Sequence, residues 1–334
     1  MTAKYSRYVL EFKRPSGTSR GVLHEKETFI LEISEGDKKG IGECAVFRGL
    51  SFDDKPDYEE KLKWLCENIK QDPQFLKEEL KEFPSIWIGY EQAALNLKNG
   101  NQLYFPSEFT KGQVPIIING LIWMGDVNYM EEQIQDKLEK GFHCIKLKIG
   151  VDWKSEHVVL QKLREKFSKD RLELRVDANG GFSIEEAKMV LKQLSDLHIH
   201  SIEQPIKAGN WNNMALLCAN TPTPIALDEE LIGIINIQEK KKLLETIKPQ
   251  YIILKPSLVG GFSGCDEWIS LADEQNIGWW ITSALESNIG LNAIAQYTFT
   301  KHSKLPQGLG TGGLFTNNFV NHMELIGERL LFKA

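Results

Sequence analysis

The chain has 334 residues, of which 42% are hydrophobic and 26% charged, a composition typical of a soluble globular protein with a large core. Its 40 Lys and Arg against 46 Asp and Glu give a net charge of −6, which argues against binding to nucleic acid or to an anionic membrane surface. The five cysteines lack CxxC spacing, no apolar run approaches the roughly 18 residues that span a bilayer, and the N-terminal residues lack a signal-peptide core, so we expect a reduced, cytoplasmic protein.

The N-terminal residues 1–112 are predicted to form a small α+β unit. Residues 7–15 and 27–46 alternate apolar and polar side chains around a Gly-Asp turn, which is typical of an antiparallel hairpin or meander. Helical periodicity follows over residues 57–70, 73–82 and 85–98. A polar connection over residues 98–113 then leads to a different pattern.

From residue 113 onward, short runs with strand character alternate with segments of helical periodicity. The predicted strands are residues 114–120, 144–150, 172–179, 199–205, 223–230, 251–256, 278–284 and 306–311. The helical segments between them include residues 129–140, 154–168, 184–197, 235–247, 264–275 and 287–300. This alternation indicates an α/β fold, a (β/α)8 barrel over residues 113–311, with a doubly wound sheet as the alternative. Residues 312–334 are expected to fold back on the N-terminal unit.

The spacing of polar residues near the strand ends favours the barrel. Positions 148, 177, 203, 228, 255, 283 and 308 are separated by nearly equal lengths of chain. In a barrel, the carboxyl ends of all strands converge on one mouth, where active sites lie.

Three carboxylates, Asp177, Glu203 and Asp228, stand at the ends of three consecutive predicted strands. Three converging acids would repel one another, and a divalent cation would remove this conflict. A donor set made of oxygen atoms favours a hard ion such as Mg²⁺. Each acid alone is also compatible with a helix N-cap or with an ion pair to lysine. Their succession on three strands favours the metal site.

Lysines flank these acids on both sides. Side chains alternate along a strand, so Lys146 and Lys148 share one face and are expected to point into the barrel, while Lys255 ends the sixth strand. Two opposed lysines beside a metal suit the removal of a proton α to a carboxylate, with one lysine as base. A strand-end salt bridge would explain any one of these lysines alone. Asn179 is a candidate hydrogen-bond partner of a ligand or of Lys146, although a turn role fits the Asn-Gly-Gly sequence equally well.

These motifs, in this order, resemble those of the enolase superfamily, in particular its muconate-lactonizing-enzyme-like subgroup. The matching elements are KLK (146–148), RVDANGG (175–181), IEQP (202–205), ALDE (226–229) and LKPS (254–257). The match covers nearly the whole chain. It implies a capping domain over residues 1–112 whose loops close over the substrate, a barrel over residues 113–311 that carries the site, and a C-terminal segment, residues 312–334, that packs on the cap.

The resemblance also implies roles for the individual residues. Asp177, Glu203 and Asp228 would bind Mg²⁺, with Mn²⁺ as a possible substitute. Sites of this superfamily use a Lys or His base beside Mg²⁺, and here Lys148 would be the general acid/base with Lys146 as its electrostatic support. Lys255 would be the opposing lysine, either a second acid/base or a cation that stabilises the enediolate. Glu229 directly follows a metal ligand and is expected to point the other way.

Within the subgroup, mandelate-racemase-like members carry a His on the seventh strand and dipeptide epimerases an Asp-x-Asp after the eighth, and neither feature is present here. Residues 283–297 and 307–315, together with 14–21 and 47–51, look like the o-succinylbenzoate synthases of menaquinone biosynthesis, a group of hydro-lyases. Such an enzyme acts on a small-molecule carboxylate whose distal succinyl group needs a polar cradle. The candidates for it are the backbone N–H groups around Ser283, Gly308 and Leu309, or Ser19 and Arg20 of the cap.

Other activities remain open on the sequence alone. An N-succinylamino acid or N-acylamino acid racemase uses the same two lysines, and one chain can carry both activities. A dipeptide epimerase, a muconate cycloisomerase and a non-catalytic metal-binding barrel are further alternatives. The oligomeric state is also open.

Overall fold

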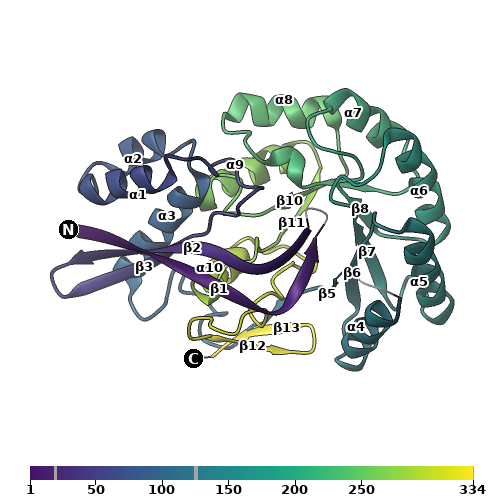
Figure 1. Cartoon of the computed structure of the whole chain (residues 1–334), viewed down its shortest axis with the longest axis horizontal. Coiled ribbons are helices and arrows are strands. Elements are labelled where there is room, and N and C mark those ends of the chain that lie inside the picture. The colour runs from purple at the N-terminus through teal and green to yellow at the C-terminus, as the bar shows by residue number, and fades with distance from the viewer. Residues whose placement is uncertain (19–20, 124–126, 334) are drawn as a thin grey trace.

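A computed structural model describes residues 1–18, 21–123 and 127–333. Figure 1 shows an N-terminal unit of strands and short helices beside a larger unit in which helices surround a parallel sheet. The N-terminal sheet has the order β1-β2-β3, with β1 (Thr2–Thr18), β2 (Gly21–Glu35) and β3 (Lys38–Cys44) all antiparallel. Its helices are α1 (Tyr58–Glu67), α2 (Pro73–Glu79) and α3 (Pro84–Asn99). None of the helices in the described ranges combines the length and apolar character that a membrane crossing requires.

Close packing of α3 on β3 fixes the N-terminal unit. A Cβ atom on Gly42 would lie 2.0 Å from the carbonyl oxygen of Gly89, so the strand and the helix can touch only because neither position carries a side chain. The alternating residues Phe29, Leu31 and Ile33 of β2 are buried in the core of the same unit. The sheet buries every second side chain against the helices, and the glycines allow α3 to lie directly on β3. The N-terminal unit is therefore a two-layer structure of one sheet and its helices.

The second unit is an α/β barrel, as predicted. Its parallel strands, in the order β11-β10-β9-β8-β7-β6-β5, are β5 (Gly120–Ile122), β6 (Cys144–Lys148), β7 (Glu173–Asp177), β8 (Ser201–Glu203), β9 (Ile225–Leu227), β10 (Tyr251–Leu254) and β11 (Gly278–Ile281). The helices around them are α4 (Val127–Glu139), α5 (Trp153–Lys166), α6 (Ile184–Asp196), α7 (Trp211–Asn220), α8 (Ile237–Ile247), α9 (Gly261–Glu274) and α10 (Asn288–Thr300). Parallel bridges from Gln307 to Ile118 and from Gly308 to Thr282 join the two edges of the sheet.

Two predicted barrel strands differ from the structure. The predicted strand 114–120 is divided, because Ile116–Ile117 (β4) pair antiparallel with β13 (Arg329–Phe332) while β5 pairs with β6. The chain changes partners at Ile118, whose N–H donates to Glu328 O. The predicted strand 306–311 is reduced to the two bridged residues, since Pro306 offers no N–H to a neighbouring strand and the chain turns away after Gly308.

The C-terminal residues contact both units. Lys13 N donates to Leu314 O at 2.8 Å and Thr316 N donates to Glu11 O at 2.9 Å, so this stretch lies along β1. The hairpin of β12 (Met323–Ile326) and β13 (Arg329–Phe332) pairs instead with β4 beside the barrel. The domain boundaries near residues 112 and 311 stay predictions.

A carboxylate of the N-terminal unit caps a barrel helix. Glu91 of α3 accepts hydrogen bonds from Phe262 N at 2.6 Å and from Ser263 N at 3.1 Å, at the start of α9. Burial of the carboxyl group raises the pKa of Glu91 to about 7 against the opposing effect of these hydrogen bonds. The two units are therefore joined by a group that titrates near neutral pH.

This cap predicts a pH dependence of stability. The pKa of Glu91 is higher in the folded chain than in the unfolded one, so the folded state binds the proton more tightly and stability falls as pH rises from about 4.5 to about 7. Relative to Glu91→Gln, the wild-type free energy of unfolding should decrease by up to about 3 kcal/mol over this range. Urea denaturation of both proteins at pH 5 and pH 8 measures the difference. An equal difference at the two pH values would contradict this assignment.

Candidate active site

Six ionisable side chains come together at the carboxyl ends of the barrel strands. Parallel pairing places Lys148, Asp177 and Glu203 side by side on β6, β7 and β8, each as the last residue of its strand. Asp228 and Lys255 directly follow β9 and β10. Lys146 lies two residues before Lys148 on the same strand, so its side chain points to the same face. The structure thus brings together every residue to which the sequence assigned the metal or the proton transfer.

On one side of the site, two lysines contact two acids. The Nζ atom of Lys146 lies 2.8 Å from Glu203 Oε2 and 3.3 Å from Asp177 Oδ2. Lys148 Nζ lies 3.1 Å from the same Asp177 oxygen. The side chains of both acids are 2% exposed and that of Lys148 is 12% exposed, so these charges interact with little solvent screening.

On the opposite side, Lys255 forms an ion pair with Asp228, and its Nζ atom is 3.9 Å from Glu203 Oε1. Lys148 and Lys255 therefore flank the carboxylates from strands that lie on either side of β7, β8 and β9. A planar carbon atom held between them would be accessible to a proton-transfer group on each face.

Burial and charge set the protonation of the site. Burial and the neighbouring Asp177 raise the pKa of Glu203 to about 7. For Asp177 the effect of burial is outweighed by Lys148, Lys146 and Lys255, which together hold its pKa below the usual range. Burial opposes the charged form of Lys255, yet Asp228 and Glu203 raise its pKa overall. The carboxylates and lysines thus compensate one another in this structure.

Asn179 connects Lys148 to a further acid that the sequence analysis placed wrongly. Asn179 Oδ1 accepts from Lys148 Nζ at 2.7 Å, so its partner is Lys148 and not Lys146, and Asn179 Nδ2 donates to Glu229 Oε1 at 3.0 Å. Glu229 lines the pocket instead of pointing away. Strand alternation stops at Asp228, because Glu229–Leu231 form a short 3-10 turn. The backbone of Asn179 also fits the predicted turn role, because its φ of +43° lies in the left-handed region.

A cavity of about 100 Å³ lies over these groups. The barrel contributes the three lysines, Asp177 and the segment 282–285, and the N-terminal unit contributes Phe47 and Leu50. The residues that line it are Phe47, Leu50, Asn119, Leu121, Trp123, Lys146, Lys148, Asp177, Asn179, Glu229, Lys255, Thr282, Ser283, Ala284, Leu285, Gly308, Gly310 and Thr311. The site is therefore built from both units.

The predicted cradle for a distal group is only partly reproduced. Ser283 and Gly308 line the cavity, but their N–H groups donate to Gly308 O and to Ile281 O, so neither is available to a ligand. Leu309 does not line the cavity; it is 1% exposed and packs in the barrel core. Ser19 and Arg20 lie outside the described residues.

The chemistry of the three acids fits a hard divalent cation. Their side chains are each 2% exposed, and Glu203 Oε1 is buried without a hydrogen-bond partner in the described part of the chain. Buried carboxylates need a compensating positive charge. In the described ranges, no three acidic, His or Cys side chains are gathered closely enough to hold a metal ion, and the ammonium groups of Lys146 and Lys255 form ion pairs with Glu203 and Asp228. The donor set therefore fits the ion in its chemistry and charge.

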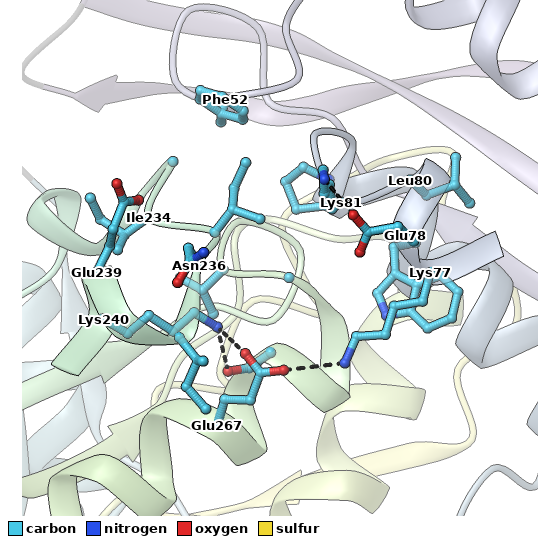
Figure 2. A pocket seen from close by; sticks show the side chains of 18 of the residues that line it. Phe52, Lys77, Glu78, Leu80, Lys81, Ile234, Asn236, Glu239, Lys240 and Glu267 are labelled. Atoms are coloured by element: carbon cyan, nitrogen blue, oxygen red, sulfur yellow. Dashed lines mark hydrogen bonds and ion pairs between the residues drawn. The ribbon is translucent and has the colours of Figure 1, made fainter. Parts of the chain in front are cut away.

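A larger cleft of about 460 Å³ lies elsewhere, between α2 and the α8 and α9 side of the barrel. Figure 2 shows its charged side chains turned toward one another: Lys77 and Lys240 both contact Glu267, at 3.2 Å and 2.8 Å. These three charges are paired with one another, whereas the smaller cavity is lined by the three strand-end lysines and Asp177, so we place the active site in the smaller cavity.

Comparison with known proteins agrees with this fold. The family model described as enolase C-terminal domain-like matches residues 129–319. The o-succinylbenzoate synthase of Desulfotalea psychrophila is 45% identical over 99% of this chain and 98% of its own length. The crystal structure of MenC from the same organism superposes with a TM-score of 0.88, at 41% identity, over 99% of both chains. The o-succinylbenzoate synthase of Thermosynechococcus elongatus, solved with Mg in its active site, has the same fold, with a TM-score of 0.75, 22% identity and 92% of each chain covered. The chain has the barrel and the strand-end acids and lysines that its sequence predicted, and its sequence and structure match members of this family. It therefore belongs to the enolase superfamily.

Proposed function

We propose that this chain is an o-succinylbenzoate synthase. It would dehydrate 2-succinyl-6-hydroxy-2,4-cyclohexadiene-1-carboxylate to 2-succinylbenzoate, a step of menaquinone biosynthesis, in the cytoplasm. The observation that carries the proposal is the 45% identity to the Desulfotalea psychrophila enzyme along practically the whole of both chains. The site supports it, because its opposed lysines and buried acids suit proton removal beside a carboxylate.

Asp177, Glu203 and Asp228 would hold the divalent cation, and Mg²⁺ is the ion we propose. The cation, when bound, would supply positive charge to the substrate carboxylate while the neighbouring carbon loses its proton. The support for Mg²⁺ is the oxygen-only donor set and the Mg in the Thermosynechococcus elongatus structure.

Lys148 is proposed as the group that moves the proton. It lies at the mouth of the barrel, and its Nζ atom is oriented by Asp177 and by the Oδ1 atom of Asn179. As an amine it would remove the proton α to the ring carboxylate, and as the resulting ammonium it would protonate the departing hydroxyl group. Lys146, one alternation deeper, would contribute its charge without contacting the reacting carbon. Lys255, on the opposite side, would stabilise the negative charge that develops on the substrate.

The decisive assay compares the cyclohexadiene substrate with a panel of N-succinyl amino acids, with Mg²⁺ and after chelation. We expect turnover of the cyclohexadiene to exceed racemisation of every N-succinyl amino acid, and chelation to abolish both. Racemisation faster than dehydration would instead identify the chain as an N-succinylamino acid racemase. No Mg²⁺-dependent turnover of either class would contradict the proposed function.

A Lys255→Arg variant separates the two activities. Arginine keeps the positive charge but does not release its proton, so it can stabilise an anion and cannot act as an acid or base. We expect the variant to lose racemisation entirely and to retain part of its dehydration rate, because racemisation needs proton transfer by both lysines. The measurement is kcat for each reaction. If both activities were retained equally, the role given to Lys255 would be wrong.

A further inference from the structure

A buried cluster of three charges joins the N-terminal sheet to the wall of the active site. It consists of Lys26 on β2, Glu43 on β3, and Glu286 in the connection between β11 and α10. The two glutamates are 0% exposed and Lys26 is 6% exposed. None of these three residues lines the catalytic cavity, and the sequence patterns predicted no role for any of them. One ammonium group and two carboxylates are therefore buried in the same interface, an arrangement that is costly unless it is well compensated.

The Glu43 carboxylate reaches from the N-terminal unit to the start of α10. It accepts from Ser287 N at 3.0 Å, from Ser287 Oγ at 2.5 Å and from Gly290 N at 2.9 Å, as well as from Thr28 Oγ1 within its own sheet. A Cβ atom on Gly290 would lie 2.7 Å from Glu43 Oε2, so the glycine makes room for the carboxylate. The helix dipole of α10 further favours a negative charge here.

The Glu286 carboxylate fixes two strand ends of the barrel. It accepts from Ala284 N at 2.6 Å, immediately after β11, and from Ser257 Oγ at 2.6 Å, two residues after Lys255. Ala284 and Leu285 line the catalytic cavity. The orientation of this part of the wall thus depends on Glu286, which neither lines the cavity nor touches an ionisable catalytic group.

Lys26 lies two residues before Thr28 on the same face of β2, and Thr28 Oγ1 donates to Glu43 Oε1 at 2.8 Å, so the Lys26 side chain is buried in the same interface as the carboxylates. Its ammonium group is buried and, within the described residues, has no hydrogen-bond partner. Burial lowers the pKa of Lys26, and the charges of Glu43 and Glu286 act in the opposite direction. Burial and the charge of Glu43 raise the pKa of Glu286, and the charge of Lys26 opposes this rise. The three groups therefore form one electrostatic unit across the interface.

We propose that Lys26 is a positioning residue whose charge draws Glu43 and Glu286 together, and so holds the N-terminal sheet against residues 282–290 and shapes the substrate cavity. The effect on catalysis rests on the proposed function, whereas the effect on the position of residues 282–290 does not. Lys26 acts through the two glutamates and would raise KM, with a smaller effect on kcat, when its charge is lost.

The test compares Lys26→Met, the double variant Lys26→Met/Glu286→Gln and the control Lys240→Met. Lys240 is an equally buried lysine of α8, paired with Glu267 in the cleft of Figure 2 and remote from the cavity. Hydrogen exchange of the amides of Ala284, Ser287 and Gly290 reports on the wall without any assay of turnover. The second measurement is KM and kcat with the cyclohexadiene substrate and Mg²⁺.

We expect Lys26→Met to accelerate exchange at these amides and to raise KM about tenfold, since two buried carboxylates then lack their counter-charge. At Ser287 and Gly290, whose N–H groups donate to Glu43, the double variant restores the net charge of the cluster and should exchange more slowly than Lys26→Met, and Lys240→Met should leave both readouts unchanged. Unchanged exchange in Lys26→Met, or exchange in the double variant as fast as in the single one, would show that the three charges do not act together. Faster exchange with unchanged KM would overturn its role in shaping the cavity. A wild-type protein without turnover would contradict the proposed function and leave the exchange test intact.

Discussion

Replacing Lys148 by Ala is expected to lower kcat for the dehydration about 10⁴-fold, at the upper end of what one general acid/base contributes. The loss is large because the same nitrogen would remove the ring proton and return it to the departing hydroxyl group. KM should change little, since Lys148 Nζ is held by Asp177 and Asn179 in the protein and is not needed to anchor the substrate. Steady-state kinetics with saturating Mg²⁺ gives both constants.

Two further variants test the reason for this loss. Lys148→Arg keeps the positive charge next to Asp177 but cannot act as a base, so it should be as inactive as Lys148→Ala. Lys240→Met, which removes a buried lysine far from the cavity, should keep its kcat. An Arg variant with near wild-type activity would show that Lys148 acts through its charge alone, and Lys255 would then be the candidate base.

Replacing Glu203 by Gln is expected to abolish the response to Mg²⁺ and to lower kcat/KM by about 10³-fold, a loss in the range found when a group that stabilises developing charge is removed. Glu203 is the central acid of the three, and its Oε1 atom is buried without a hydrogen-bond partner in the described structure. The amide would remove the negative charge while keeping nearly the same shape. Calorimetric titration with Mg²⁺ and turnover at increasing Mg²⁺ measure the two effects.

The control for this variant is Asp53→Asn. Asp53 is a fully buried acid of the N-terminal unit that accepts hydrogen bonds from Ser85 and does not line the cavity. This variant should lose stability and keep its affinity for Mg²⁺. Undiminished Mg²⁺ binding by Glu203→Gln would exclude Glu203 as a ligand.

Period-two alternation and the even spacing of strand ends were enough to predict the barrel and the meeting of its lysines and acids. These signals work because hydrogen-bonded pairing fixes which face each residue occupies, as it does for Lys148, Asp177 and Glu203. They fail where regular pairing ends. Glu229 lies in a 3-10 turn, so alternation gave the wrong direction for its side chain.

Contacts between distant segments could not be read from local patterns. Residues 306–311 have a sequence typical of a strand. Only Gln307 and Gly308 of this segment bridge the sheet edges, because the others have no neighbouring strand to pair with. The N–H groups of Ser283 and Gly308 were predicted to face a ligand and are used within the barrel. Glu43 and Ser287 come into contact only through the docking of the two units, and nothing in the alternation near either residue indicates the other.

The pairing of β1 with residues near position 315 has a consequence for the order of events during synthesis. Phe12 bridges Phe315, and the hydroxyl group of Tyr8 donates to Asn317 O, a contact across 309 positions of sequence. Sheet pairing at such separation forms late, and it requires that both segments have left the ribosome. The barrel strands up to β11 can therefore begin to assemble during translation, whereas β1 obtains its partner near position 315 only after that segment has been synthesised. Catalytic competence is therefore expected to appear only after residues 312–317 have left the ribosome.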